Sequence, residues 1–125
     1  MNSKSNKHEE PTLFAKLDSI IEEALMAGAR QLLFCPMSDG RLEVKHRNGQ
    51  ISRPIECVPS RLARELVCRI KMASNLSIDI RGQTQGGEGE TFREIRVNET
   101  MRIHKYKVTI TPCSFGEEAI IEFLN

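Results

Sequence analysis

The sequence predicts a single α+β domain with a largely antiparallel sheet and with its helices packed on one face of that sheet. Two segments space their apolar residues as helices do, several others alternate apolar and polar residues as strands do, and turn signals separate neighbouring strands. The expected order is helix, three strands, helix, three strands. Because 125 residues suit one domain, we expect residues 12–125 to form it and residues 1–11 to be a mobile polar tail.

The first helix is predicted over residues 12–27, where apolar residues follow the spacing of one helical face and charged residues occupy the other. Thr12 is placed to cap its start, and Gly28 is placed to end it in a left-handed conformation. A short strand, residues 31–35, follows and ends at Pro36.

A hairpin is predicted next. Residues 41–46 alternate as a strand with one solvated face, and a returning strand covers residues 51–55. Between them Asn48 and Gly49 form a tight turn in which both residues adopt positive φ. Pro54 cannot donate a ladder hydrogen bond, so it predicts that the second strand lies at an edge of the sheet or ends early.

The second helix is predicted over residues 60–74, with Ser60 as its N-cap. The polar segment 82–90 interrupts the chain after this helix, and its glycine-rich part, residues 86–90, reads as a flexible turn. Strands are expected over 92–97, 102–111 and 118–124. Residues 112–116 make the last turn. The residues expected on the buried face of this helix are Leu62, Leu66, Ile70 and Ala73.

Composition argues against several classes of partner. Lys and Arg number 18 against 17 Asp and Glu, and a net charge of +1 attracts neither nucleic acid nor membrane strongly. No apolar run approaches the roughly 18 residues that span a bilayer, and the first ten residues lack the pattern of a signal peptide. We therefore expect a cytoplasmic protein without membrane insertion or nucleic-acid binding. A basic strip on two strands is the weaker alternative, made of Lys45, His46, Arg47, Lys105 and Lys107.

No residue pattern predicts catalysis, a cofactor or a metal. The glycine-rich stretch within residues 86–90 has two carboxylates and no Lys, so it does not suit a phosphate. The histidines have no nucleophile motif beside them. The four cysteines are widely spaced and read as buried thiols in a reducing compartment. A zinc site that converges from distant strands stays open as an alternative, with the ligands Cys35, Cys113, His46 and His104.

The second half carries a more specific signature. The segment RIKMASNLSIDIR at residues 69–81, then Gln85 and Gly87, then FREIRV and TPCSFGEEAIIEFLN, resembles the region before the motor of type II secretion and type IV pilus-assembly ATPases. The resemblance covers residues 13–124 and implies a PAS-like α+β fold. It further implies that Arg81, Gln85 and Gly87 contact a phosphate in trans, on nucleotide held by another protein. Arg69 and Lys71 are the candidate residues of an interaction surface.

The departures from that family set the expected function. Gly82 and Glu88 replace two expected basic positions, and the polar strand signature of the family has become apolar at residues 30–35. The sequence ends where the linker to the motor would begin. The expectation is therefore a non-catalytic, bacterial interaction module that docks on a secretion or pilus ATPase or on its assembly partners. A PAS-like small-ligand sensor and a degenerate structural paralogue are the alternatives; the oligomeric state is not predicted.

Overall fold

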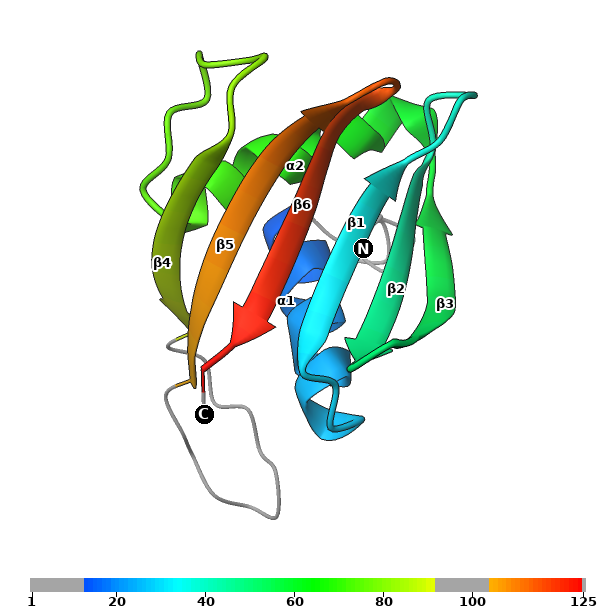
Figure 1. Ribbon diagram of the computed structural model, residues 1–125, viewed down its shortest axis with the longest axis vertical. Coiled ribbons are helices and arrows are strands. Elements are labelled where there is room, and N and C mark those ends of the chain that lie inside the picture. Colours follow the sequence, from blue (N-terminus) through cyan, green and yellow to red (C-terminus); the bar gives the residue numbers. More distant parts are fainter. Residues whose placement is uncertain (1–12, 92–103, 125) are drawn as a thin grey trace, which may run out of the picture.

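The computed structural model of the protein describes residues 13–91 and 104–124. Within them the chain order is two helices and six strands, in the predicted sequence α-β-β-β-α-β-β-β (Figure 1). The predicted polar tail, the Thr12 cap and the predicted strand 92–97 lie outside the described residues. The elements are α1 (Leu13–Met26), β1 (Gln31–Pro36), β2 (Leu42–Asn48), β3 (Ile51–Val58), α2 (Ser60–Ala73), β4 (Gln85–Thr91), β5 (His104–Cys113) and β6 (Gly116–Phe123).

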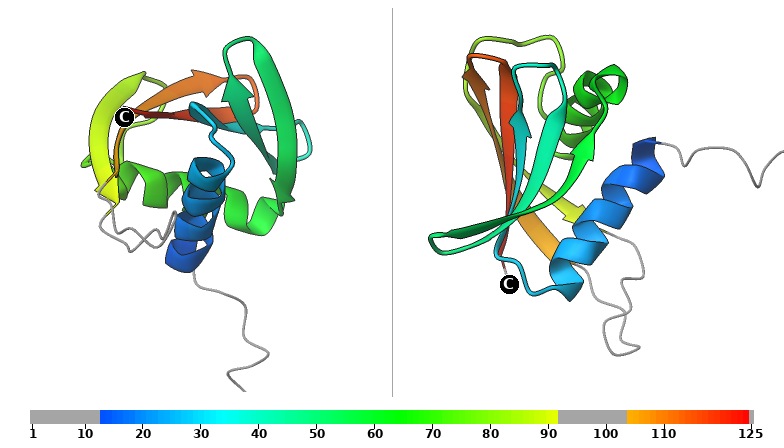
Figure 2. Two further views of the ribbon diagram at one scale, coloured as in Figure 1. Left: turned by 90° about the horizontal axis from the view of Figure 1, so that it is seen from below. Right: turned by 90° about the vertical axis from the view of Figure 1, so that its right-hand side faces the viewer.

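The six strands form one antiparallel sheet in the order β3-β2-β1-β6-β5-β4. The first and last strands of the chain are therefore neighbours at its centre. Both helices of the described residues pack on the same face of the sheet (Figure 2). The predicted α+β class, with helices on one face of an antiparallel sheet, is confirmed.

The core lies between the sheet and the two helices. Alternation in β5 turns Tyr106, Val108 and Ile110 toward the helices, and each is at most 3% exposed. Phe34 of β1 and Leu66 of α2 meet in the same cluster with no exposed surface. Each such side chain contributes roughly 1.5–3 kcal/mol by its burial, so this layer fixes both helices against the sheet.

The glycine-rich stretch predicted as a flexible turn, residues 86–90, lies within β4, so that prediction is wrong. β4 pairs with β5 from Gln85 opposite Ile110 to Thr91 opposite His104. Glycine has low strand propensity, but Gly87 faces the C-terminal end of α2 so closely that a Cβ there would lie 2.6 Å from the carbonyl oxygen of Ser74. Close packing explains the glycine where propensity suggested a loop.

The β2–β3 turn differs from its prediction by one residue. Asn48 belongs to β2 and pairs with Ile51, so the two-residue loop is Gly49–Gln50. Gly49 has φ 63°, whereas Asn48 does not have a positive φ; glycine at the first loop position is typical of a type II′ turn. The Asn48 side chain instead accepts a hydrogen bond from the Arg30 backbone N–H, 2.8 Å away. β3 is an edge strand, as its proline predicted.

The helix ends are confirmed for α1 and corrected for α2. Gly28 has φ 74° after the last turn of α1, as predicted. The N-cap of α2 is Pro59, without a side-chain capping hydrogen bond, so Ser60 is the first helical residue and not the cap. The buried face of α2 is also rotated relative to its prediction: Ala73 is exposed, and the buried residues are Ala63, Leu66, Val67, Ile70 and Lys71.

Candidate functional site

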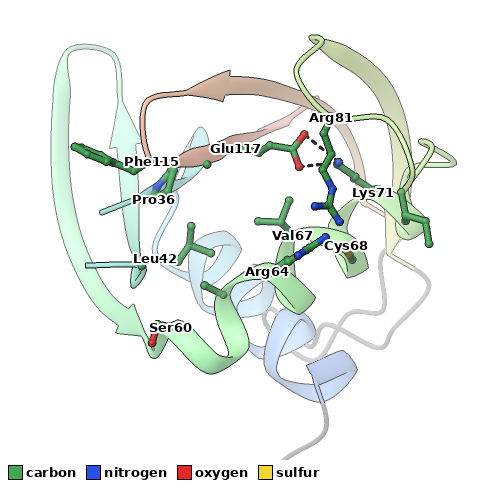
Figure 3. Close-up of a pocket in the computed structure, with 14 residues that line it drawn as sticks. Pro36, Leu42, Ser60, Arg64, Val67, Cys68, Lys71, Arg81, Phe115 and Glu117 are labelled. Carbon is green, nitrogen blue, oxygen red and sulfur yellow. Dashed lines mark hydrogen bonds and ion pairs between the residues drawn. The ribbon is translucent and has the colours of Figure 1, made fainter. Parts of the chain in front are cut away.

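A cavity of about 270 Å³ lies between α2, the loop that precedes β4, the C-terminal end of β1 and the N-terminal end of β6. Its walls are largely apolar, with Pro36, Leu42, Val67 and Phe115 among them. Leu42 and Val67 are buried core residues, whereas Phe115 stands in the β5–β6 turn. The charged residues that line it are Arg64, Lys71, Arg81 and Glu117 (Figure 3).

Lys71 joins three parts of the chain beside this cavity. Its Nζ donates to the two carboxylate oxygens of Glu117 on β6, at 2.8 and 3.0 Å (Figure 3). It also donates to the carbonyl oxygen of Ile80, at 3.1 Å. The Lys71 side chain is 1% exposed and that of Glu117 is 18% exposed. Because an ammonium group has three donors, these contacts use all of them. Lys71 is therefore a buried, paired residue, which corrects the expectation that it supplies a basic group to an interaction surface.

Arg64 and Arg81 reach the cavity from different elements. Arg64 lies on α2 and Arg81 on the loop before β4; both are exposed residues, and their guanidinium groups point into the same space (Figure 3). Within the described part of the chain, neither side chain has a hydrogen-bond or ion-pair partner. Since Lys71 and Glu117 neutralise each other, the two guanidinium groups leave the cavity with an uncompensated positive charge.

Two of the residues that line the cavity are large, apolar and exposed. Phe115 is 58% exposed and Ile78 is 43% exposed. Large exposed apolar groups that are grouped beside a pocket mark binding surfaces more often than those that are scattered singly. The cavity thus combines free positive charge with apolar walls that continue onto the surface.

The structure separates the residues predicted to contact a phosphate. Arg81 lines the cavity, but Gln85 and Gly87 do not. The Gln85 side chain accepts from the backbone N–H of Ser77 at 3.1 Å and donates to the carbonyl oxygens of Ser77 and Ile80. It therefore holds the loop that carries Arg81, and Gly87 packs against α2. The predicted phosphate turn is not assembled from these three residues.

Sequence reasoning missed Arg64 and Phe115. Arg64, Val67, Cys68 and Lys71 line the cavity at the spacing i, i+3, i+4 and i+7 of one helical face, a signal that the sequence contains. Nothing local in the sequence indicates that the β5–β6 turn would place Phe115 opposite that face. Arg69, also predicted at an interaction surface, is half-buried on another side of α2 and does not line the cavity.

The strand register excludes a zinc site that contains both Cys35 and His46. His46 lies opposite Leu32 and faces the core, whereas Cys35 alternates with Phe34 and faces the open side of the sheet. In the described residues no three or more His, Cys, Asp or Glu side chains are grouped to hold a metal. The expectation of buried thiols is wrong for Cys57 and Cys113, which are exposed.

The basic strip is also divided by the register. His46 faces the core, so it does not belong to the strip. On the open face Lys107 and Arg47 are separated by β6 and β1, where Glu122 and Gln31 lie opposite them. Gln31 accepts a hydrogen bond from the Arg47 side chain. The positive charges on this face are therefore interleaved with acidic and amide groups.

The lining of the cavity offers groups that can bind a ligand. Ser60 and Cys68 line it, but no histidine is among its lining residues, and its one carboxylate is held by Lys71. A nucleophile in such a position lacks a general base to activate it. The arrangement can instead hold an anionic group against the two guanidiniums and an apolar group against the walls.

Compared with models of known protein families and with curated proteins, the sequence matches none. Neither helix of the described residues is long and apolar enough to cross a membrane. The residues of the cavity are therefore the main observation on which a function can rest.

Proposed function

We propose that this domain is a non-catalytic interaction module related to type II secretion and type IV pilus-assembly ATPases. In this role it docks on such an ATPase, or on an assembly component, in the bacterial cytoplasm. The single observation that carries the proposal is the cavity that Arg64 and Arg81, both without partners in the described chain, line together with exposed Phe115. The sequence resemblance before the motor domain supplies the class of partner.

The chemistry of the cavity supports a docking role. Arginine and aromatic residues are enriched where protein partners bind, and they dominate the energy of such interfaces. A partner that brings a carboxylate to Arg64 and Arg81 would compensate a charge that the domain leaves open. The four cysteines are all free thiols, which supports a reducing compartment such as the cytoplasm.

Charge reversal tests the docking role. The tagged protein and its Arg64→Glu, Arg81→Glu double variant are used to retain partners from lysate of the native cells, with identification by mass spectrometry. Arg30→Glu is the matched control, because Arg30 is also exposed and precedes β1 at the end away from the cavity. We expect wild type and control to retain a secretion or pilus ATPase component and the double variant to lose it. Retention that is unaffected by the double reversal contradicts the proposal, as does recovery of nothing from that machinery.

Arg81 keeps a second role within the same proposal. It is the one member of the predicted phosphate contact that lines the cavity as an exposed side chain. If it meets a nucleotide phosphate in trans, Arg81→Ala lowers the ATPase rate of the docked partner while the domain itself stays folded. An unchanged rate in a verified complex removes Arg81 from that role.

A small-ligand sensor is the second candidate, and the cavity volume of about 270 Å³ is the observation that favours it. A ligand present at 100 times its Kd stabilises a protein by about 2.7 kcal/mol, which a thermal-unfolding screen detects. We would screen anionic metabolites and nucleotides against the isolated domain. No change of Tm across the panel argues against the sensor and leaves the docking role in place.

A further inference from the structure

We infer that the cavity binds the free carboxyl terminus of a partner chain whose last residue is apolar. The inference rests on the proposed docking function and names the element that docks. It follows from three properties of the cavity: its charge, its walls and its size.

The charge selects a carboxylate. Arg64 and Arg81 each present a planar fork of N–H donors that matches two carboxylate oxygens. The third cation, Lys71, is already saturated by Glu117 and Ile80. Because Glu117 is neutralised by Lys71, the two guanidiniums are the groups left to hold the carboxylate.

The walls select an apolar neighbour for that carboxylate. Leu42 and Val67 are at most 6% exposed, and both border the cavity. Phe115 and Ile78 extend the apolar surface outward from it. A ligand that offered only charge would leave these walls in contact with water, whereas an apolar side chain removes them from it.

The size selects a single residue. About 270 Å³ lies below the range of about 300–1,000 Å³ for pockets that enclose drug-sized ligands. The last residue of a chain carries its side chain and its terminal carboxylate on one Cα, so it meets both requirements at once. An internal Asp or Glu uses its side chain for the charge and needs a second residue for the walls. The exposed rim at Phe115 and Ile78 then accommodates the preceding residues of the partner.

Peptide titration followed by NMR tests the inference on the protein alone. The probe is an acetylated pentapeptide of glycine and serine that ends in leucine with a free carboxylate. The comparison probes are its C-terminal amide and the same peptide ending in serine. We expect amide-resonance shifts in α2, in residues 76–84 and in the β5–β6 turn. Amidation, Arg64→Gln or Arg81→Gln should each weaken binding at least tenfold, whereas Arg30→Gln should leave the Kd unchanged.

Two results overturn the inference. The first is equal affinity for the acid and the amide, or no binding of the leucine peptide at millimolar concentration. The second is binding of free 4-methylpentanoate as tightly as the peptide, which would assign the cavity to a small acid. The docking proposal is judged separately: loss of partner retention by the charge-reversal variant sustains docking even where the peptide fails. Peptide binding without any retained secretion or pilus component sustains the inference and removes the proposed partner class.

Discussion

Position 87 has no room for a side chain, because the chain after α2 packs directly against it. A Cβ at this position would lie 2.6 Å from the Ser74 carbonyl oxygen and 2.8 Å from a methyl carbon of Leu76. We expect Gly87→Ala to lower the free energy of unfolding by about 1–3 kcal/mol, because overpacking forces backbone and side chains apart. Urea denaturation measures the change.

Gly86 provides the matched control for this substitution. A Cβ there would meet only the Val108 carbonyl oxygen, at 3.8 Å, which is an ordinary contact. Gly86→Ala should be neutral or slightly stabilising, since alanine loses less conformational freedom on folding than glycine. Equal changes in the free energy of unfolding would contradict this explanation, because packing on α2 would then not be the reason that position 87 requires glycine.

His46 makes the stability depend on pH. The residue is 9% exposed, and its Nε2 has no hydrogen-bond partner in the described structure. Burial, and then the positive charge of Arg53, hold the pKa of His46 below its usual value, while Glu23 on α1 opposes them. The unfolded chain therefore binds a proton more readily, so the His46 contribution is fully present above the ordinary pKa of histidine and is lost as the pH falls through its lowered pKa.

We expect the urea midpoint of the wild type to fall between pH 7.5 and pH 5, and to fall less in His46→Leu. The substitution removes the group that must be protonated in the core, and it keeps the site apolar. The difference between the two slopes isolates His46 from the carboxylates that also titrate. If the urea midpoints of the two proteins fall equally with pH, the prediction is contradicted, because protonation of His46 then does not lower the stability.

At the scale of elements, Lys71 links α2 to the sheet through Glu117 and to the loop before β4 through the carbonyl oxygen of Ile80. We expect Lys71→Met to cost about 3 kcal/mol, because it leaves Glu117 half-buried beside an apolar chain. Lys71→Met combined with Glu117→Leu should cost less than the sum of the single changes. Chemical denaturation of the four proteins gives the coupling energy, and additive effects would contradict a stabilising pair.

The ion pair between Lys16 on α1 and Glu56 on β3 is the control for this cycle. Its atoms are 2.6 Å apart, but its side chains are 39% and 27% exposed. Water screens such a pair, and it is worth about 1 kcal/mol or less. Lys16→Met should therefore cost clearly less than Lys71→Met, although both remove one end of a bridge between a helix and the sheet.

The sequence predicted elements well where periodicity decides them and poorly where tertiary packing does. Alternation identified the buried face of β5, and helical spacing identified α1. β4 escaped prediction because Gly87 serves close packing against the C-terminal end of α2, which no local pattern reports. Lys71 was expected on the surface because a lysine is rarely buried, and its partner Glu117 lies 46 residues away in the sequence.

At the scale of the whole molecule, the central pairing of β1 with β6 joins the two ends of the described fold. Hairpin signals predict neighbours along the chain, so they do not predict this pairing. The cavity depends on it: Pro36 at the end of β1 and Glu117 on β6 border the space that α2 and its following loop close. The candidate site could be predicted only in part from sequence because it is assembled from segments that meet through the sheet order.

The central position of β6 makes the fold depend on the last strand. β6 lies between β1 and β5, and its Ala119 and Ile121 are at most 1% exposed. Removal of residues 116–125 would divide the sheet into a β3-β2-β1 part and a β5-β4 part, each with an uncovered edge. We expect the shortened chain to be unfolded at 25 °C by far-ultraviolet circular dichroism, because it loses two core side chains and the strand that pairs with both β1 and β5, whereas the net stability of a domain is only about 5–15 kcal/mol. A chain without residues 1–11 keeps every described helix and strand and should unfold cooperatively. Addition of a synthetic peptide of residues 116–125 should restore structure to the shortened chain, whereas a cooperatively folded chain without β6 would contradict the central role of that strand.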